Sequence, residues 1–199
     1  MHKQLTVALA LAAALALPQA AQAVVLTGST GPAANTVMNY SGAGLASFDL
    51  DLATFAPTTF SFVLEDADLA GPLAFNALVR NLAGAALDEF SVALDGIAFL
   101  AAGSVTPAFG TVGTIGYGAH TANVAFSAPE WAEFQFGNAL GTPGTANWLL
   151  DTAGLRAGAT FTLTAATARA AEVPEPSSAV LVMSALALLG ATAAKRKRG

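Results

Sequence analysis

Short segments with alternating apolar and polar residues recur along the middle of the chain. In residues 58–64, Phe60, Phe62 and Leu64 occupy one phase of the alternation, and Thr59 and Ser61 occupy the other. A period of two is typical of a β-strand that buries one face. The same pattern predicts strands at residues 90–94, 97–100, 131–136 and 161–164, and weaker alternation predicts strands at residues 24–27, 47–52, 77–81 and 123–126.

Turn-forming residues separate these segments. Asp95-Gly96 joins two predicted strands, and it predicts a β-hairpin because Asp-Gly readily adopts the positive φ of a tight turn. Residues 106–118 and 137–147 are rich in glycine and are expected to be loops. Eight or nine short strands, with no long amphipathic helix between residues 24 and 171, indicate an all-β domain. We expect an antiparallel β-sandwich or a jelly-roll-like fold.

The N-terminus lacks this alternation. A weakly positive start precedes an apolar run of 13 residues, 5–17. Small residues follow as Ala21-Gln22-Ala23, the A-x-A pattern of a signal-peptidase site. Residues 1–23 are therefore predicted to be a signal peptide that is cleaved after Ala23. A permanent anchor is the alternative, but the run is short, since helical residues at about 1.5 Å each must cross a hydrocarbon core of about 30 Å.

The C-terminal segment is long enough to span a membrane. Residues 177–194 are 18 residues without a charged side chain, which as a helix would measure about 27 Å. A basic cluster follows at once, Lys195, Arg196, Lys197 and Arg198. It predicts a cytoplasmic stop signal, because basic residues flank a spanning helix on the cytoplasmic side. A plain single-pass anchor is one alternative; a GPI-type signal is another, against which the basic cluster argues.

The residues before this segment complete an ordered set of motifs. Pro174-Glu175-Pro176, the apolar segment and the basic cluster resemble the PEP-CTERM sorting domain of Gram-negative bacteria, over about residues 172–199. The resemblance implies recognition by an exosortase, a membrane transpeptidase-like enzyme, and delivery to the cell surface or the extracellular polymeric matrix. Residues 165–176 are expected to form an extended link, since proline disfavours helix. The tail says nothing about residues 24–171, because unrelated ectodomains carry it.

Charge is distributed unevenly along the chain. Residues 24–173 hold twelve acidic side chains and three arginines, a net charge of −9, whereas the whole chain has −5. Nucleic-acid binding needs clustered cations, so this composition excludes it. The chain has no cysteine, which excludes a disulfide scaffold. The stability of the central domain must therefore come from an apolar core.

Acidic residues are the best candidates for a binding site. Asp49 and Asp51 are two residues apart, so on a strand both carboxylates would face one way. Glu65, Asp66 and Asp68 form a second group after the strand at residues 58–64. Calcium takes about six to eight oxygen ligands, and the two groups could bind it if they meet in space. A solvated acidic rim is the alternative. The spacing of an EF-hand is absent, and we assign no metal site.

The sequence contains no recognisable catalytic constellation. Glu130 and Glu133 could form a glycosidase pair, but surface placement explains both, since alternation puts Glu133 on the face opposite Phe134. His120 is the only histidine after His2, which is too few for a zinc site, and no G-x-S-x-G motif accompanies it. The glycines at 110–118 do not follow the P-loop pattern. We therefore expect a protein that is not an enzyme and has no cofactor.

Four aromatic residues could stack on sugars: Tyr40, Tyr117, Trp131 and Trp148. Trp148 adjoins the glycine-rich residues 137–147 and is expected to be the more exposed tryptophan, although core packing is the usual fate of large aromatics in a small β-domain. Exposed aromatics near Trp148 would favour carbohydrate binding.

The sequence as a whole predicts a signal peptide (1–23), an ectodomain (24–171) and a sorting segment (172–199). The protein is expected to be exported, held in the membrane at least transiently, and delivered to the cell surface or the extracellular matrix. A structural or adhesive role is the main expectation. Binding to exopolysaccharide as a carbohydrate-binding module, and extracellular hydrolysis, are the alternatives.

Overall fold

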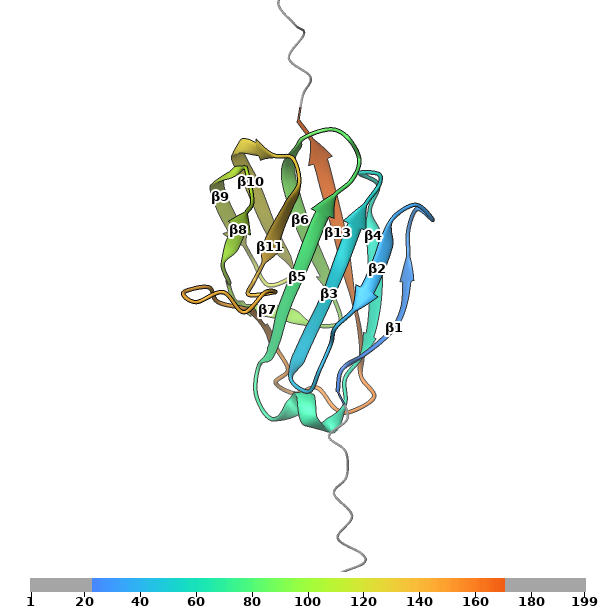
Figure 1. Cartoon of the computed structure of the whole chain (residues 1–199). Helices are drawn as coiled ribbons and strands as arrows, with labels where there is room; N and C mark the ends of the chain where they lie inside the picture. Colours follow the sequence, from blue (N-terminus) through green and yellow to red (C-terminus); the bar gives the residue numbers. More distant parts are fainter. Residues whose placement is uncertain (1–22, 171–199) are drawn as a thin grey trace, which may run out of the picture.

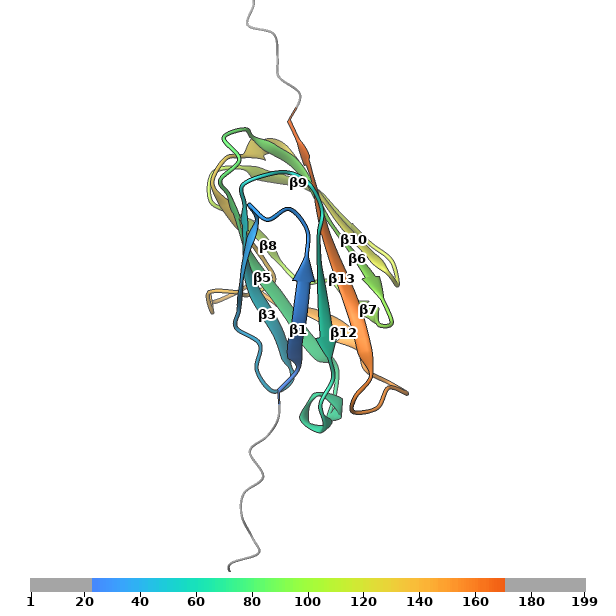
Figure 2. The ribbon, with the colours of Figure 1, turned by 90° about the vertical axis from the view of Figure 1, so that its right-hand side faces the viewer.

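The computed structural model describes residues 23–170, which fold into two β-sheets packed face to face (Figure 1; Figure 2). The six-stranded sheet contains, in spatial order, β1 (Val25–Thr30), β4 (Thr58–Val63), β13 (Thr160–Arg169), β6 (Leu87–Asp95), β10 (Thr121–Glu130) and β9 (Thr111–Tyr117). The other sheet contains β2 (Thr36–Asn39), β3 (Leu45–Leu52), β5 (Leu73–Asn81), β11 (Glu133–Phe136) and β8 (Val105–Pro107), with β12 (Trp148–Asp151) beside β5 and β7 (Ala98–Ala101) beside β12. A short 3-10 helix, η1 (Asp66–Leu69), precedes β5.

The second sheet is mixed. Its strands β3 and β5 are parallel, with Leu45 opposite Ala74 and Asp51 opposite Arg80, while the other pairings in the described part of the chain are antiparallel. The chain leaves β3, runs back along β4 in the opposite sheet, and returns through η1 to begin β5 at the end where β3 began. The all-β class and the sandwich are confirmed, but the expectation of purely antiparallel pairing is corrected.

The predicted alternation correctly identifies side chains that form the core. Phe60, Phe62 and Leu64 are fully buried, as their shared phase predicts. In β6, Phe90, Val92 and Leu94 also point inward. Sheet stacking of this kind fills a layer about 10 Å thick with the inward side chains of both sheets. Burying one phenylalanine or leucine contributes about 1.5–3 kcal/mol, so the apolar phase of the strands is the main stabilising element.

Aromatic rings join the two sheets. Phe48 of β3 stacks on Phe60 of β4 with ring centroids 4.1 Å apart. At the other side of the sandwich, Phe136 of β11 stacks on Trp148 of β12 at 4.4 Å, and Phe90 of β6 contacts Phe136 edge-on at 5.5 Å. Offset-stacked and edge-on pairs add about 0.5–1.5 kcal/mol beyond the area that they bury. The two sheets are thus held by a continuous aromatic layer.

The turn at Asp95-Gly96 does not form the predicted hairpin. Gly96 has the expected positive φ of 81°, but the chain crosses to the other sheet, where β7 pairs with β12. A Cβ at Gly96 would lie 2.8 Å from the carbonyl oxygen of Thr160. The local turn chemistry was therefore predicted correctly, and the partner of the strand that follows was not.

Two predicted irregular segments contain strands instead. Residues 106–118 were expected to be a loop but form the end of β8 and the whole of β9, because β9 is an edge strand whose exposed positions tolerate glycine. The first five residues of the predicted link, 165–169, belong to β13. The strand predicted at residues 131–136 begins only at Glu133. Residues 137–147 form no strand or helix, as expected.

The described chain begins and ends at opposite ends of the sandwich (Figure 1). Val25 of β1 and Thr160 at the start of β13 both pair with Val63, whereas Arg169 is the tenth and last residue of β13. Within residues 23–170, none of the helical structure is long and apolar enough to cross a membrane. The predicted signal peptide before Ala23, the predicted transmembrane segment 177–194 and the basic tail 195–199 lie outside the described residues.

Candidate functional site

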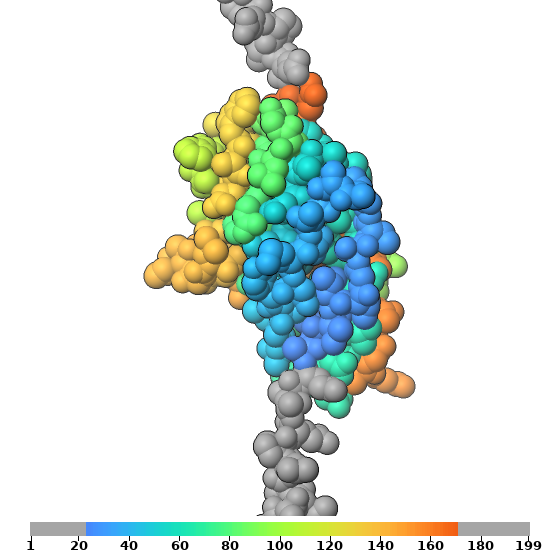
Figure 3. Space-filling view, turned by 45° about the vertical axis from the view of Figure 1, so that its right-hand side comes forward, coloured from blue at the N-terminus to red at the C-terminus, as the bar shows by residue number. Residues whose placement is uncertain are grey.

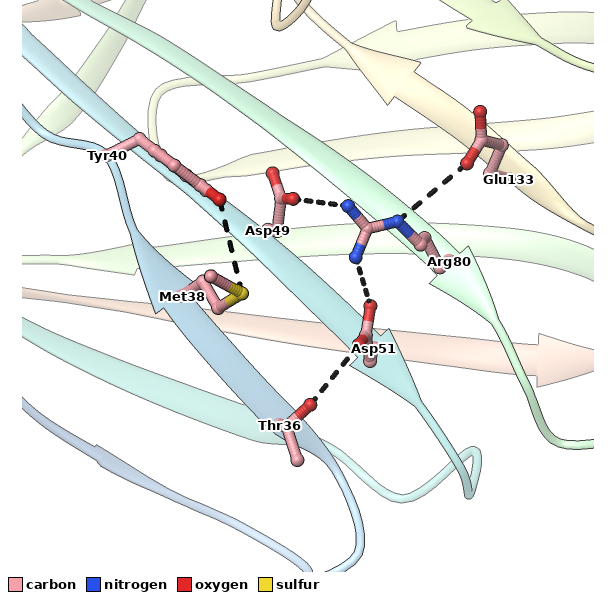
Figure 4. Close-up of polar contacts among 7 residues, drawn as sticks. All are labelled: Thr36, Met38, Tyr40, Asp49, Asp51, Arg80 and Glu133. Carbon is pink, nitrogen blue, oxygen red and sulfur yellow. Dashed lines mark hydrogen bonds and ion pairs between the residues drawn. The ribbon is translucent and has the colours of Figure 1, made fainter.

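Three carboxylates surround one arginine on the outer face of the mixed sheet (Figure 4). Asp49 and Asp51 extend from β3 on the same face, as their spacing predicts. The parallel register sets Asp51 opposite Arg80 of β5, and the antiparallel register of β11 sets Glu133 opposite Arg80 on its other side. The cluster therefore joins three neighbouring strands, and it depends on the β3–β5 pairing.

Arg80 makes two short hydrogen bonds in this cluster. Its Nη2 donates to Asp49 Oδ2 at 2.5 Å, and its Nη1 donates to Asp51 Oδ1 at 2.8 Å. Its Nε lies 3.9 Å from Glu133 Oε2, and Thr36 Oγ1 donates to the second oxygen of Asp51 at 3.3 Å. Partial burial lowers the pKa of Arg80, but the hydrogen bond to Asp51 and the charges of both aspartates outweigh it and raise the pKa overall. Arg80 is thus a fixed cation that clamps the strands.

This geometry does not form the calcium site considered from the sequence. The guanidinium already occupies the position between Asp49 and Asp51. In the second acidic group, the buried Asp68 accepts the backbone N–H groups of Gly44 and Glu65, at 2.8 and 2.9 Å. Gly44 directly precedes β3, so Asp68 lies about five residues, or roughly 16 Å, along the strand from Asp49. The described residues contain no group of three or more His, Cys, Asp or Glu disposed to hold a metal.

Glu130 is buried, which corrects the expectation that it lies on the surface. Its carboxylate is fully shielded from solvent. Its Oε2 accepts the backbone N–H groups of Phe109 and Gly110 at 2.9 and 2.8 Å, and its Oε1 accepts that of Ala132 at 2.7 Å. Burial raises the pKa of Glu130, but the hydrogen bonds from Gly110, Ala132, Phe109 and Trp131 outweigh it and lower the pKa overall. This carboxylate organises two loops and has no open side for a substrate.

The alternation in β10 does not predict this burial. Ala122, Val124 and Phe126 face the core, but Ala128 is exposed and the pairing of β10 with β6 shifts between Ala125 and Glu130. A buried carboxylate must find donors, because an ionised group is costly to bury without hydrogen bonds. Two of the donors come from the β8–β9 turn some 20 residues earlier, and no spacing rule identifies them. Glu130 and Glu133 therefore have different surroundings and do not form an acid–base pair.

The two tryptophans have the reverse of their expected exposure. Trp148 is fully buried, and its indole ring contacts Phe99, Tyr117 and Phe136. Trp131, in the connection between β10 and β11, is 63% exposed. His120 lies in the turn between β9 and β10, where its Nδ1 is 3.1 Å from the Ile97 carbonyl oxygen. This placement agrees with a polar turn residue.

A hollow of about 410 Å³ lies on the outer face of the six-stranded sheet. It crosses β6, β10 and β9, and polar side chains at its lining are Glu89, Ser91, Thr114 and Asn123. Phe90 also borders it but is buried in the core. The hollow offers hydrogen-bonding groups and a single carboxylate, and it contains neither Glu130 nor Glu133.

Comparison with known proteins assigns the C-terminal end of the chain. Residues 172–198 match the PEP-CTERM protein-sorting motif, which confirms the resemblance drawn from Pro174-Glu175-Pro176 and the residues that follow. Comparisons with curated proteins and with solved structures give no match. The chain is thus a β-sandwich that carries a PEP-CTERM sorting motif. The motif implies export and exosortase-mediated sorting to the cell surface.

Proposed function

We propose that this chain is a non-catalytic protein of the cell surface or the extracellular matrix, with a structural or adhesive role. The observation that carries the proposal is the sorting motif at residues 172–198, which follows a folded domain described as far as residue 170. In this scheme the predicted signal peptide starts export, the apolar segment 177–194 holds the chain in the membrane, and the basic tail 195–199 stays in the cytoplasm. An exosortase then acts at Pro174-Glu175-Pro176.

The carboxylates support a structural role for the domain. Glu130 is saturated by backbone donors, and Asp49 and Asp51 bind Arg80. A glycosidase needs two carboxyl groups that face one substrate across a cleft, about 5–9.5 Å apart. Neither group provides that arrangement. The hydrolase alternative therefore loses the pair on which it rested, and a domain that presents surfaces rather than a reaction centre is the better proposal.

Replacing Pro174-Glu175-Pro176 by three alanines tests the sorting function. In a host with an active exosortase, the variant should keep the mass of its tail and stay in the membrane fraction, while the unmodified chain reaches the surface. Pro143→Ala, in the exposed loop 137–147, is a matched control that should behave as the unmodified chain does. If the triple variant has the same final mass and the same surface delivery as the chain with the intact motif, processing at this motif is refuted.

Carbohydrate binding is a second candidate, and the hollow on the outer face favours it. Glu89 and Asn123 could bond adjacent hydroxyl groups of a sugar, because carboxylate and amide groups present two polar atoms each. Trp148 itself lies in the core and cannot stack on a sugar, but Tyr117 is 50% exposed and its ring centroid lies 6.0 Å from that of Trp148. A glycan array probed with the detergent-solubilised chain should give binding that Asn123→Ala abolishes. Binding that persists unchanged in Asn123→Ala would place the sugar elsewhere. If the unmodified chain binds no glycan on the array, carbohydrate binding is removed as a candidate.

A further inference from the structure

Three exposed apolar side chains lie on neighbouring loops at one end of the sandwich. Phe109 in the β8–β9 turn is 77% exposed, Trp131 between β10 and β11 is 63% exposed, and Leu82 after β5 is 61% exposed. Figure 3 shows these three loops together on the upper part of one face, as the yellow-green, yellow and green atoms. Single exposed apolar residues are ordinary, so their grouping at one end is the informative feature.

Hydrogen bonds fix these loops to one another. Glu130 binds the backbone of Phe109 and of Ala132, next to Trp131. The N–H of Asn81, next to Leu82, donates to the Ala132 carbonyl, and the Asn81 side chain donates to the carbonyl oxygens of Ala85 and Glu130. The exposed side chains therefore project from a preorganised platform.

The same end of the sandwich is where the described chain stops. The N–H of Ala170 donates to the carbonyl of Ala86, in the loop that begins at Leu82, at 2.8 Å. Six residues, 171–176, then separate Ala170 from the apolar segment 177–194. However they are arranged, six residues span at most about 20 Å. The loop between β8 and β9 lies three strands from β13, a lateral distance of about 14 Å. The start of the apolar segment therefore lies no more than about 34 Å from the β8–β9 loop, and nearer to the loop that begins at Leu82.

We infer that Leu82, Phe109 and Trp131 insert into the lipid surface on the outer side of the membrane that holds the C-terminal segment. The inference rests on the proposed function, because it requires that segment to be in the bilayer. Tryptophan is enriched at the boundary between headgroups and acyl chains, where one end of the ring is apolar and the other is hydrated. The covalent tether makes the contact intramolecular, so three side chains suffice where a free protein would need more.

The net negative charge of the ectodomain indicates that this contact is apolar rather than electrostatic. The ectodomain has a net charge of −9, from twelve acidic side chains and three arginines in residues 24–173, and anionic lipids would repel it. An electrostatic contact would weaken as salt screens it, whereas insertion of apolar side chains would not. The membrane contact should therefore persist in high salt, and each side chain that is removed should lower the equilibrium constant for insertion by about tenfold.

Tryptophan fluorescence can test the inference, because the chain has only two tryptophans and Trp148 is buried. The full chain is reconstituted into vesicles of phosphatidylethanolamine and phosphatidylglycerol whose acyl chains carry bromine, a short-range quencher. Flotation of the vesicles first shows whether the chain is anchored. The difference between the unmodified chain and Trp131→Phe then isolates Trp131, which should be blue-shifted and quenched, most strongly by bromine near the headgroups, in low and high salt.

A second tryptophan position supplies the matched control. Leu140 is 60% exposed, but its loop leaves the sheet beside Asn76, about five residues or 16 Å from the Leu82 end of β5. The double variant Trp131→Phe, Leu140→Trp should float, and the emission of the introduced indole should show no quenching beyond that of Trp148. An anchored chain in which Trp131 is not quenched overturns the inference and leaves the proposed function standing. A chain that does not float contradicts the proposed membrane segment itself and, with it, this inference.

Discussion

The Glu130 carboxylate accepts the backbone N–H of Gly110 at 2.8 Å, from a turn that lies 20 residues earlier in the chain. The bond is one of three short backbone contacts to the same buried side chain. It joins the β8–β9 turn to the end of β10, so one acidic residue determines the conformation of two loops. Charged acceptors form stronger hydrogen bonds than neutral ones, which makes this residue the most informative position to vary.

Replacing Glu130 should destabilise the fold and change its response to acid. Glu130→Ala leaves buried N–H groups without an acceptor and should lower the free energy of unfolding by about 2–3 kcal/mol. Because folding lowers the pKa of Glu130 below the ordinary 4.5, its stabilisation is complete at neutral pH. It is lost as the pH falls through the lowered folded-state pKa. Urea unfolding at a series of pH values measures both effects.

Glu130→Gln isolates the titration. This variant keeps one acceptor oxygen and should show a smaller decline of stability in acid than the unmodified chain does. Glu89→Gln, at an exposed position, is the control for the loss of one carboxylate. An acid profile for Glu130→Gln that coincides with the unmodified profile would show that Glu130 does not contribute to it.

Arg80 should stabilise the mixed sheet through its two short hydrogen bonds. Arg80→Ala removes these bonds and leaves Asp49, Asp51 and Glu133 to repel one another, so we expect a loss of about 1–2 kcal/mol, since the cluster is only partly buried. Arg80→Lys should restore only part of the loss, because an ammonium group cannot reproduce the two-pronged contact. Thermal melts in low and high salt measure the effect, which should shrink as salt increases. Equal stability of the alanine variant and the unmodified chain would contradict the clamp.

Calcium should have no effect on stability. Arg80 occupies the position between Asp49 and Asp51, and Asp68 is engaged by backbone N–H groups. A ligand that binds only the folded state raises the melting temperature, so millimolar calcium added to the chain should leave its melting temperature unchanged. A reproducible rise, reversed by a chelator, would reveal a site that this arrangement of side chains does not provide.

The two tryptophans should differ strongly in their effect on stability. Trp148→Ala opens a cavity against Phe136, whose ring centroid is 4.4 Å away, and should lower the free energy of unfolding by about 3–5 kcal/mol. Trp131→Ala changes an exposed position and should alter it by no more than about 0.5 kcal/mol. Chemical denaturation of both variants gives the comparison, and similar losses in the two would contradict the placement of the indole rings.

Gly96 should tolerate a side chain poorly. Gly96→Ala combines the strain of φ 81° with a contact of 2.8 Å to the Thr160 carbonyl. Gly141 has a similar φ of 68° with open space around it, so Gly141→Ala carries the backbone strain alone, about 1–2 kcal/mol. The shift in denaturation midpoint should be clearly larger for Gly96→Ala. A larger shift at Gly141 would mean that the close approach is absent.

Most strands that alternation predicted have one face in the core, although β1 was predicted and is mostly exposed, and β12, which buries Trp148 and Leu150, was missed. Phe60, Phe62 and Leu64 illustrate the general case, because a period of two over a buried face is a local property of the sequence. The alternation failed for β9, since an edge strand with exposed positions and two glycines, Gly113 and Gly116, needs no apolar phase. It also failed for the partner of β7, because the sheet that a strand joins depends on the whole topology.

The candidate site was harder to predict from the sequence than the fold was. The spacing of Asp49 and Asp51 predicts that both face the same way. The position of Arg80 beside them depends on the parallel register of β3 and β5. Parallel pairing arises from a long connection through the other sheet, and no local pattern records it. The sorting motif was predicted in full because its parts follow one another in the sequence and do not depend on the fold: Pro174-Glu175-Pro176, an apolar segment and basic residues, in that order.

The position of β13 has a consequence for the order in which the domain can assemble. This strand comes last in the described chain, yet it lies between β4 and β6 and bonds to both. In a chain that crosses a membrane beginning at its N-terminus, β4 and β6 reach the far side first and have no common neighbour until residues 160–169 follow. Completion of the six-stranded sheet therefore coincides with the arrival of the sorting segment at the translocation machinery. The last steps of folding and the first step of sorting would then occur at the same place and time.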